Sequence, residues 1–206
     1  MEEAMNTQLT GVLRQKMSVR KMLGLGFCAV LLVIAVFGEG VCLQAAPADE
    51  YALKAAFIIN FARFTQWPAR SAAGPANTLE LCVAADPSVR RAFRQIDGQQ
   101  VDKRFMRVIA VEETDDLSGC ALLFIGRTTS RDAREKLLAA VAAKPVLTIG
   151  ETKDFARLGG VMNFIMRKGG LHFEINPETA RQQKLTQSSR LLQLATIVAE
   201  KKPEDR

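Results

Sequence analysis

Apolar side chains recur every three or four positions between residues 50 and 65, which predicts an amphipathic helix. The positions that share its apolar face are Leu53, Phe57, Phe61 and Phe64. Pro68 should end this helix, because the residue before a proline avoids helical geometry. Trp67, the only tryptophan in the chain, therefore follows the last helical turn. Its ring either covers the end of the core or stands at the surface as a binding anchor.

Four short apolar segments predict β-strands in the middle of the chain. They are residues 79–85, 106–111, 121–126 and 145–150. The third of them, residues 121–126, is uniformly apolar, as expected of a buried parallel strand. Asp86-Pro87 and Ser130 supply helix starts after the first and third strands, since each offers a side-chain oxygen as N-cap.

The C-terminal third predicts a β-hairpin followed by a helix. "VMNFIMR" and "LHFEIN" flank Lys168-Gly169-Gly170, a glycine turn between two strands. Asn176-Pro177 repeats the combination of N-cap and proline. Ser188 or Ser189 should open a last helix, "RLLQLATIVAEKK".

This order of elements predicts an open, mostly parallel α/β sheet flanked by helices. Right-handed crossovers favour the flavodoxin-like strand order 2-1-3-4, with the hairpin added at one edge. The first and third strands would then be neighbours.

The N-terminus has the features of a secretory signal peptide. Residues 22–38 carry no charge, follow Arg20 and Lys21, and precede the small-residue triplet Ala46-Pro47-Ala48. We expect a signal peptide at residues 1–48 and a single mature α/β domain at residues 49–206, exported to the periplasm. An uncleaved anchor is the alternative. Translation starting at Met17 or Met22 would fit a signal peptide better.

Charge and cysteine content fit this compartment. The net charge of +6 is too small and too scattered to indicate nucleic-acid binding. Only Cys82 and Cys120 remain after signal cleavage, and an even count in an oxidising compartment favours a disulfide. The two residues fall in and just before the neighbouring first and third strands. Two buried free thiols are the alternative.

The sequence offers little catalytic chemistry. The first strand-to-helix turn, "AADPSV", lacks a glycine-rich phosphate loop, and the lone His172 has no metal-ligand motif around it. We therefore expect no catalytic residues, no cofactor and no metal. Three acidic residues, Asp86, Glu112 and Glu151, end predicted strands, where we expect a helix cap and solvated loop entrances.

One loop could bind an anion. Residues 126–131, "GRTTSR", combine hydroxyl groups and two arginines with a helix N-terminus. A capped helix with exposed arginines is the simpler interpretation. Trp67, Arg127 and Arg131 are thus the candidates for a partner or ligand surface.

The ordered set of segments resembles the YfiR-like family of periplasmic regulators. The resemblance rests on "KAAFIINFARFTQWP", "LELCVA", "GCALLFIG", "KPVLTIGETKDFARLGGVMNF", "LHFEINPETARQQKL" and "SSRLLQLATIV", in this order over residues 51–198.

This resemblance implies a periplasmic regulator. It implies a protein that binds and represses the periplasmic sensory domain of an inner-membrane diguanylate cyclase, with an outer-membrane lipoprotein relieving the repression. The output would be the cyclic-di-GMP level and hence biofilm formation. The resemblance also implies a homodimer and one bridge at Cys82 and Cys120; a second cysteine pair of the family has no counterpart here. The alternatives are a periplasmic small-ligand-binding module that feeds a membrane sensor kinase and, as the weaker of the two, an uncharacterised envelope enzyme.

Overall fold

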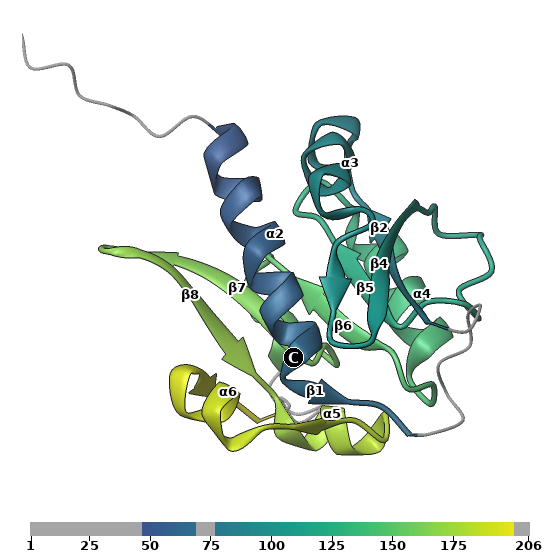
Figure 1. The fold of residues 1–206 in the computed structure, drawn as a ribbon. Helices are drawn as coiled ribbons and strands as arrows, with labels where there is room; N and C mark the ends of the chain where they lie inside the picture. The colour runs from purple at the N-terminus through teal and green to yellow at the C-terminus, as the bar shows by residue number, and fades with distance from the viewer. Residues whose placement is uncertain (1–46, 69–76, 200–206) are drawn as a thin grey trace, which may run out of the picture. The chain divides into compact units, whose positions relative to one another are not determined.

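The centre of the fold is an eight-stranded mixed sheet with the order β10-β8-β7-β6-β5-β2-β4-β3. The computed structural model describes residues 47–68 and 77–199, and Figure 1 shows their arrangement. The sheet strands are β2 (Thr78–Ala84), β3 (Gln100–Val101), β4 (Arg104–Ala110), β5 (Leu122–Ile125), β6 (Leu147–Gly150), β7 (Met162–Arg167), β8 (Gly170–Ile175) and β10 (Thr196–Ile197). A separate two-stranded sheet pairs β1 (Thr65–Gln66) with β9 (Thr186–Gln187).

Four parallel strands confirm the predicted order. In the sheet they run β4-β2-β5-β6, which is 2-1-3-4 in chain order. The predicted hairpin is also present, because β7 and β8 pair antiparallel and β7 joins β6 in parallel. The short strand β3 adds an antiparallel edge beside β4 that the pattern did not predict. The expected signal peptide lies outside the described residues, except for its last two positions.

Helices and 3-10 turns connect the strands. They are α2 (Pro47–Arg63), α3 (Pro87–Phe93), η1 (Arg94–Ile96), α4 (Arg131–Val141), η2 (Phe155–Arg157), α5 (Pro177–Gln182) and α6 (Ser189–Leu194). The predicted N-caps are confirmed: the side chains of Asp86, Ser130, Asn176 and Ser188 accept hydrogen bonds from the first turns of α3, α4, α5 and α6. No helix in the described ranges is both long and apolar enough to cross a membrane.

Helix α2 packs through aromatic rings against β7 and β8. The Phe61 ring lies 5.5 Å from that of Phe164 and 4.9 Å from that of Phe173, and Phe57 lies 5.9 Å from Phe173. Phe61 is buried, as predicted, whereas Leu53 is 47% exposed and the prediction for it is wrong. The buried strip of α2 instead includes Lys54, whose charge has partners inside the fold.

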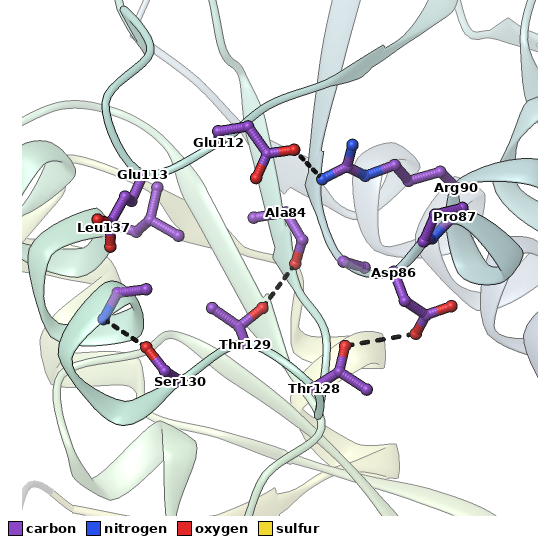
Figure 2. A pocket seen from close by; sticks show the side chains of 12 residues that line it. Ala84, Asp86, Pro87, Arg90, Glu112, Glu113, Thr128, Thr129, Ser130 and Leu137 are labelled. Atoms are coloured by element: carbon purple, nitrogen blue, oxygen red, sulfur yellow. Dashed lines mark hydrogen bonds and ion pairs between the residues drawn. The ribbon is translucent and has the colours of Figure 1, made fainter.

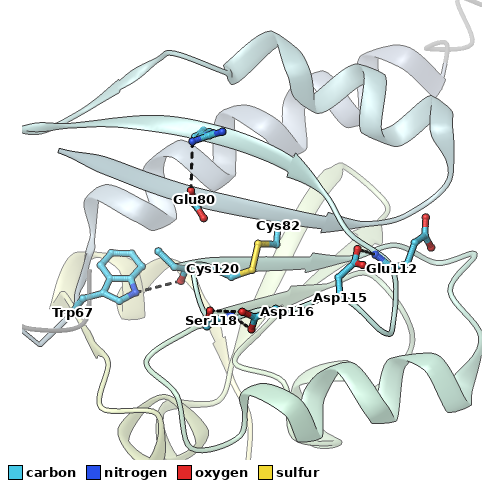
Figure 3. The surroundings of a disulfide bond; sticks show 10 residues. Trp67, Glu80, Cys82, Glu112, Asp115, Asp116, Ser118 and Cys120 are labelled. Atoms are coloured by element: carbon cyan, nitrogen blue, oxygen red, sulfur yellow. Dashed lines mark hydrogen bonds and ion pairs between the residues drawn. A yellow bond between two sulfur atoms is a disulfide. The ribbon is translucent and has the colours of Figure 1, made fainter. Parts of the chain in front are cut away.

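A disulfide lies on the other face of the sheet. Cys82 of β2 and Cys120, just before β5, are bonded with their Cα atoms 5.7 Å apart, which confirms the predicted bridge (Figure 3). The two strands are parallel neighbours, with Leu81 opposite Leu122. Cys82 is buried in the apolar cluster that α4 covers, which also contains Leu123.

The last predicted helix is shorter than expected. Helix α6 ends at Leu194, and Ala195 has an extended backbone (φ −91°, ψ 153°). Thr196 and Ile197 then form β10, in parallel with Glu174 and Ile175 of β8. Two β-branched residues beside an open strand edge gain a sheet partner, and this tertiary pairing outweighs the helical pattern.

Removing the disulfide should destabilise the fold substantially. The bridge spans a sequence separation of 38 residues, and the chain-entropy model gives roughly 4 kcal/mol for a loop of this size. We expect the Cys82→Ala/Cys120→Ala variant to lose about this much free energy of unfolding in urea titrations. Wild-type protein measured with a reductant should match the variant. Equal midpoints for oxidised wild type and variant would contradict the prediction.

Candidate functional site

The carboxyl ends of β2 and β5 border a cleft of about 410 Å³. From β2 the chain crosses to β4 on one side, and β5 lies on the other, so the strand order reverses at this point. Open α/β sheets bind ligands at such positions. We call this hollow the switch-point cleft (Figure 2). It is lined by Ala84, Ala85, Asp86, Pro87, Arg90, Glu112, Glu113, Thr128, Thr129, Ser130, Ala133 and Leu137.

The hydroxyl groups on one wall of the cleft form hydrogen bonds with neighbouring groups of the protein. Thr129 Oγ1 donates to the carbonyl of Ala84 at 3.0 Å, and Ser130 Oγ accepts from the first turn of α4. Thr128 Oγ1 lies 3.4 Å from Asp86 Oδ2. Hydrogen bonds from Ser88, chiefly from its side chain, hold the pKa of Asp86 below its usual range. Asp86 is therefore an ionised helix cap at neutral pH.

The opposite wall carries a surface ion pair. Arg90 Nη2 lies 2.5 Å from Glu112 Oε1, and the Glu112 side chain is 68% exposed. Glu113 lies 3.4 Å from the Lys136 ammonium. The prediction of a solvated loop entrance is thus right for Glu112.

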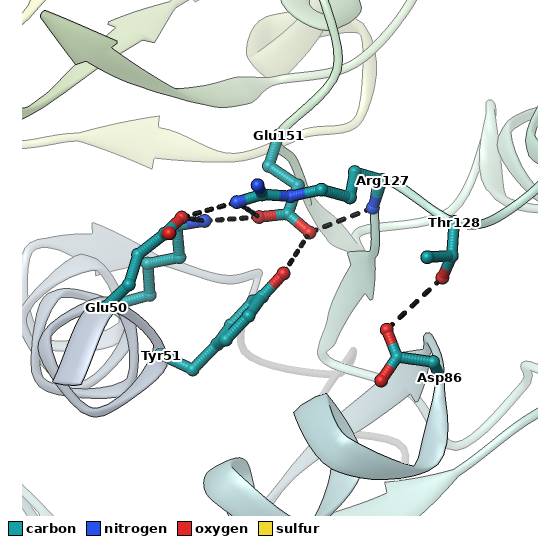
Figure 4. A network of polar contacts seen from close by, with 7 residues as sticks. Glu50, Tyr51, Asp86, Arg127, Thr128 and Glu151 are labelled. Carbon is teal, nitrogen blue, oxygen red and sulfur yellow. Dashed lines mark hydrogen bonds and ion pairs between the residues drawn. The ribbon is translucent and has the colours of Figure 1, made fainter. Parts of the chain in front are cut away.

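A second polar cluster at the same edge is largely buried. Lys54 of α2, 1% exposed, pairs with Glu50 at 2.5 Å and with Glu151, whose side chain is 2% exposed. Tyr51 donates a hydrogen bond to Glu151 Oε1 at 3.0 Å, and the Arg127 backbone N–H donates to the same oxygen at 2.8 Å. We call these five residues the α2 charge cluster (Figure 4).

The Arg127 guanidinium closes the cluster toward solvent. It contacts Glu50 and lies 3.3 Å from Glu151 Oε2, while its own side chain is 50% exposed. Glu151 thus accepts from a backbone N–H, a phenol and two cationic groups. A buried carboxylate is tolerated when it is paired and hydrogen-bonded in this way.

The cluster shifts the pKa values of three of its members. Burial, followed by the charge of Glu151, raises the pKa of Tyr51 well above its usual range. Burial works against the charges of Arg127 and Glu50, but their ionic partners outweigh it. The pKa of Arg127 is accordingly raised, chiefly by Glu151, and that of Glu50 is lowered, chiefly by Lys54. All three shifts favour a neutral Tyr51, a charged Arg127 and an ionised Glu50.

The structure separates the three residues predicted as a partner or ligand surface. Trp67 is half-buried beside Arg104 and donates from Nε1 to the Ala121 carbonyl at 3.3 Å, just before β5 (Figure 3). Arg127 follows the other end of β5. Arg131 is exposed and pairs along α4 with Glu135 at 2.8 Å. Trp67 and Arg127 thus lie at opposite ends of β5 and do not form one site.

The sequence prediction missed the α2 charge cluster. Glu151 was expected at a solvated loop entrance, and this expectation is wrong because its side chain is buried against α2. One signal was available: a lysine at position 54 lies next to the apolar strip of the helix. The partner of that lysine lies 97 residues away in the sequence, so only the tertiary structure reveals it.

The described residues include no group of three or more His, Cys, Asp or Glu side chains that could hold a metal ion. His172 lies exposed on β8. The polar residues of the switch-point cleft form ion pairs and hydrogen bonds with one another, as do those of the α2 charge cluster.

Truncating Glu151 should destabilise the protein much more than truncating an exposed carboxylate. The Glu151→Ala variant leaves Lys54 buried with one partner fewer, and breaking such a pair costs about 3–5 kcal/mol. Glu135→Ala is the matched control, since it breaks the exposed pair with Arg131, worth roughly 0–1 kcal/mol. Urea unfolding of both variants measures the difference. Similar losses would show that the buried pair stabilises the fold no more than the surface pair.

Tyr51 should ionise at higher pH in the folded protein than in the unfolded chain. The raised pKa means that the folded state keeps a proton that the unfolded chain releases near pH ~10. This contribution to stability is fully present below that pH and is lost as the pH rises through the folded pKa. Tyr51 is the only tyrosine, so tyrosinate absorbance reports it alone. If the absorbance of Tyr51 titrates at the same pH in the folded protein and in protein unfolded with guanidinium, the prediction is contradicted.

Comparison with known proteins matches this architecture to one family. No curated protein matches the chain. A family model described as YfiR/HmsC-like matches residues 51–196, which span the fold from α2 to β10. This match covers well over half of the chain and includes the disulfide, the switch-point cleft and nearly all of the α2 charge cluster. The chain belongs to the YfiR/HmsC-like family.

Proposed function

We propose that this protein is a periplasmic regulator that binds and represses the periplasmic sensory domain of an inner-membrane diguanylate cyclase. The observation that carries the proposal is the family match over residues 51–196, because this family suggests periplasmic regulation of cyclic-di-GMP signalling. The proposed output is the cellular cyclic-di-GMP level and, through it, biofilm formation. The signal peptide predicted at residues 1–48 would deliver the protein to that compartment.

The chemistry of the described residues supports a binding role over a catalytic one. Ionised groups at the sheet edge are used in helix capping and ion pairs, such as those of Asp86 and Lys54. The YfiR-like domain is regulatory and is not known as an enzyme family. The disulfide suits an oxidising compartment.

Repression requires only that the regulator prefer one state of its partner. A protein that binds the inactive arrangement of a sensory domain more tightly shifts the population toward that arrangement. We propose that an outer-membrane lipoprotein competes for the regulator and so releases the cyclase. We also propose that the regulator acts as a homodimer, which would match a dimeric sensor in symmetry.

The switch-point cleft favours a second candidate function, a small-ligand-binding module that feeds a membrane sensor kinase. Its volume of about 410 Å³ and its position fit a small-molecule site. This alternative predicts that periplasmic metabolites, such as nucleotides or amino acids, raise the melting temperature of the purified protein. No shift with any of them would exclude it for those ligand classes.

Deleting the gene should raise the cellular cyclic-di-GMP level, because the cyclase would lose its repressor. The measurement is mass spectrometry of nucleotide extracts from the deletion strain and its parent. Expression of the exported protein from a plasmid should restore the parental level. Expression of residues 49–206 without the signal peptide is the control and should not restore it. An unchanged level after deletion would contradict the proposed function.

A further inference from the structure

The outer half of the β7–β8 hairpin extends beyond the rest of the sheet. β6 pairs with β7 only at Met162 and Asn163, and β10 pairs with β8 only at Glu174 and Ile175. Within the described ranges, residues 164–167 and 170–173 pair only with each other. We call this segment, residues 164–173, the arm; Figure 1 shows it projecting from the sheet. Its outer strand edges therefore offer backbone N–H and C=O groups to another chain.

One face of the arm is apolar along its whole length. Phe164 lies opposite Phe173, and two residues further Met166 lies opposite Leu171, so all four side chains point to the same face. Phe57 and Phe61 of α2 cover the first pair. In the second pair, Leu171 is partly buried against the same core cluster, whereas Met166 is exposed.

Exposed or partly exposed apolar residues lie on both sides of this contact. Met166 is 57% exposed, and Leu171 is partly exposed. On α2, Leu53 lies one helical turn before Phe57 and is 47% exposed. An apolar strip thus continues from the core onto the surface of the arm and of α2. We call Leu53, Phe57, Met166 and Leu171 the arm surface.

The tip of the arm adds positive charge. Arg167 and Lys168 are exposed and precede Gly169, whose positive φ of 105° forms the turn. In contrast to the cations of the α2 charge cluster, neither forms an ion pair within the described part of the chain. Carboxylates of a partner would complement them.

We propose that the arm surface docks an apolar segment of a partner protein that carries carboxylates beside its apolar residues. The apolar side chains would cover Met166 and Leu171, and the carboxylates would pair with Arg167 and Lys168. A polypeptide can also satisfy the free strand edges of the arm, which lipid chains cannot do. The inference rests on the proposed function in one respect: it assigns to this surface the contact with the repressed sensory domain.

Two substitutions in the arm test this assignment, each with a matched control in the other hairpin of the sheet. Met166→Glu places a charge on the apolar face, and Lys168→Glu reverses a turn charge. Phe105→Glu and Lys103→Glu make the same changes at the β3–β4 turn, which lies at the opposite edge of the sheet. All four residues are exposed, so the variants should fold, which thermal melting checks.

The first measurement is repression in the deletion strain, with each variant expressed at graded levels. We expect the two arm variants to need about tenfold more protein for half-repression, as for loss of a central interface contact. The two control variants should repress as the wild type does. Arm variants that repress normally would overturn the assignment. If the wild-type protein itself does not restore the parental cyclic-di-GMP level, the proposed function fails. The second measurement then tests binding by the arm surface independently of that function.

The second measurement is binding of a labelled synthetic peptide, with valines at alternate positions and two glutamates at one end. The comparison is the same peptide with lysines in place of the glutamates. We expect wild type to bind the acidic peptide about tenfold more tightly than the basic one, and the arm variants to lose this preference. Equal binding of the two peptides would overturn the proposal. Co-sedimentation with phosphatidylglycerol vesicles is the last check. If the wild type sediments with the vesicles and only the arm variants fail to do so, the proposal is overturned, and the arm surface binds a membrane instead.

Discussion

The contact between α2 and the sheet is the interaction on which the rest of this structure depends. The rings of Phe57 and Phe61 pack on Phe164 and Phe173 of the hairpin, and this joins the first helix of the described chain to strands about a hundred residues later. Burial of aromatic rings supplies a large hydrophobic contribution but little directional specificity. The helix also needs a feature that fixes its rotation and its position along the sheet.

The α2 charge cluster provides that feature. Lys54 and Glu151 are buried together, and each would be costly to bury without the other. In the observed placement of α2, Lys54 reaches Glu151 while Phe61 lies in the core. That placement turns Leu53 outward, so the exposed leucine at the arm surface is a consequence of the buried ion pair.

The switch-point cleft and the arm carry different chemistry. At the switch point, polar side chains cap helices and pair with one another around an open cleft. The arm instead presents apolar residues and two cations that form no ion pair with the described residues, on a hairpin whose outer edges pair with no other described strand. A regulatory protein can use both, one surface for a partner and another for a small ligand, without any catalytic group. The family membership places this arrangement among regulators, and the proposed partner contact is assigned to the arm.

The sequence alone determined the helix caps from local signals, the order of the four parallel strands from the rule of right-handed crossovers, and the favoured disulfide from the cysteine count and the expected compartment. Buried parallel strands read as short apolar runs, and Asp86 and Ser130 mark helix starts within their own first turns. The tertiary structure decided what depends on distant partners. Thr196 lies in a strand because it pairs with the open edge of β8. Glu151 is buried because Lys54 of α2 forms an ion pair with it. Hydrophobic periodicity records which residues avoid water, but it does not record which residue far along the chain pairs a buried charge.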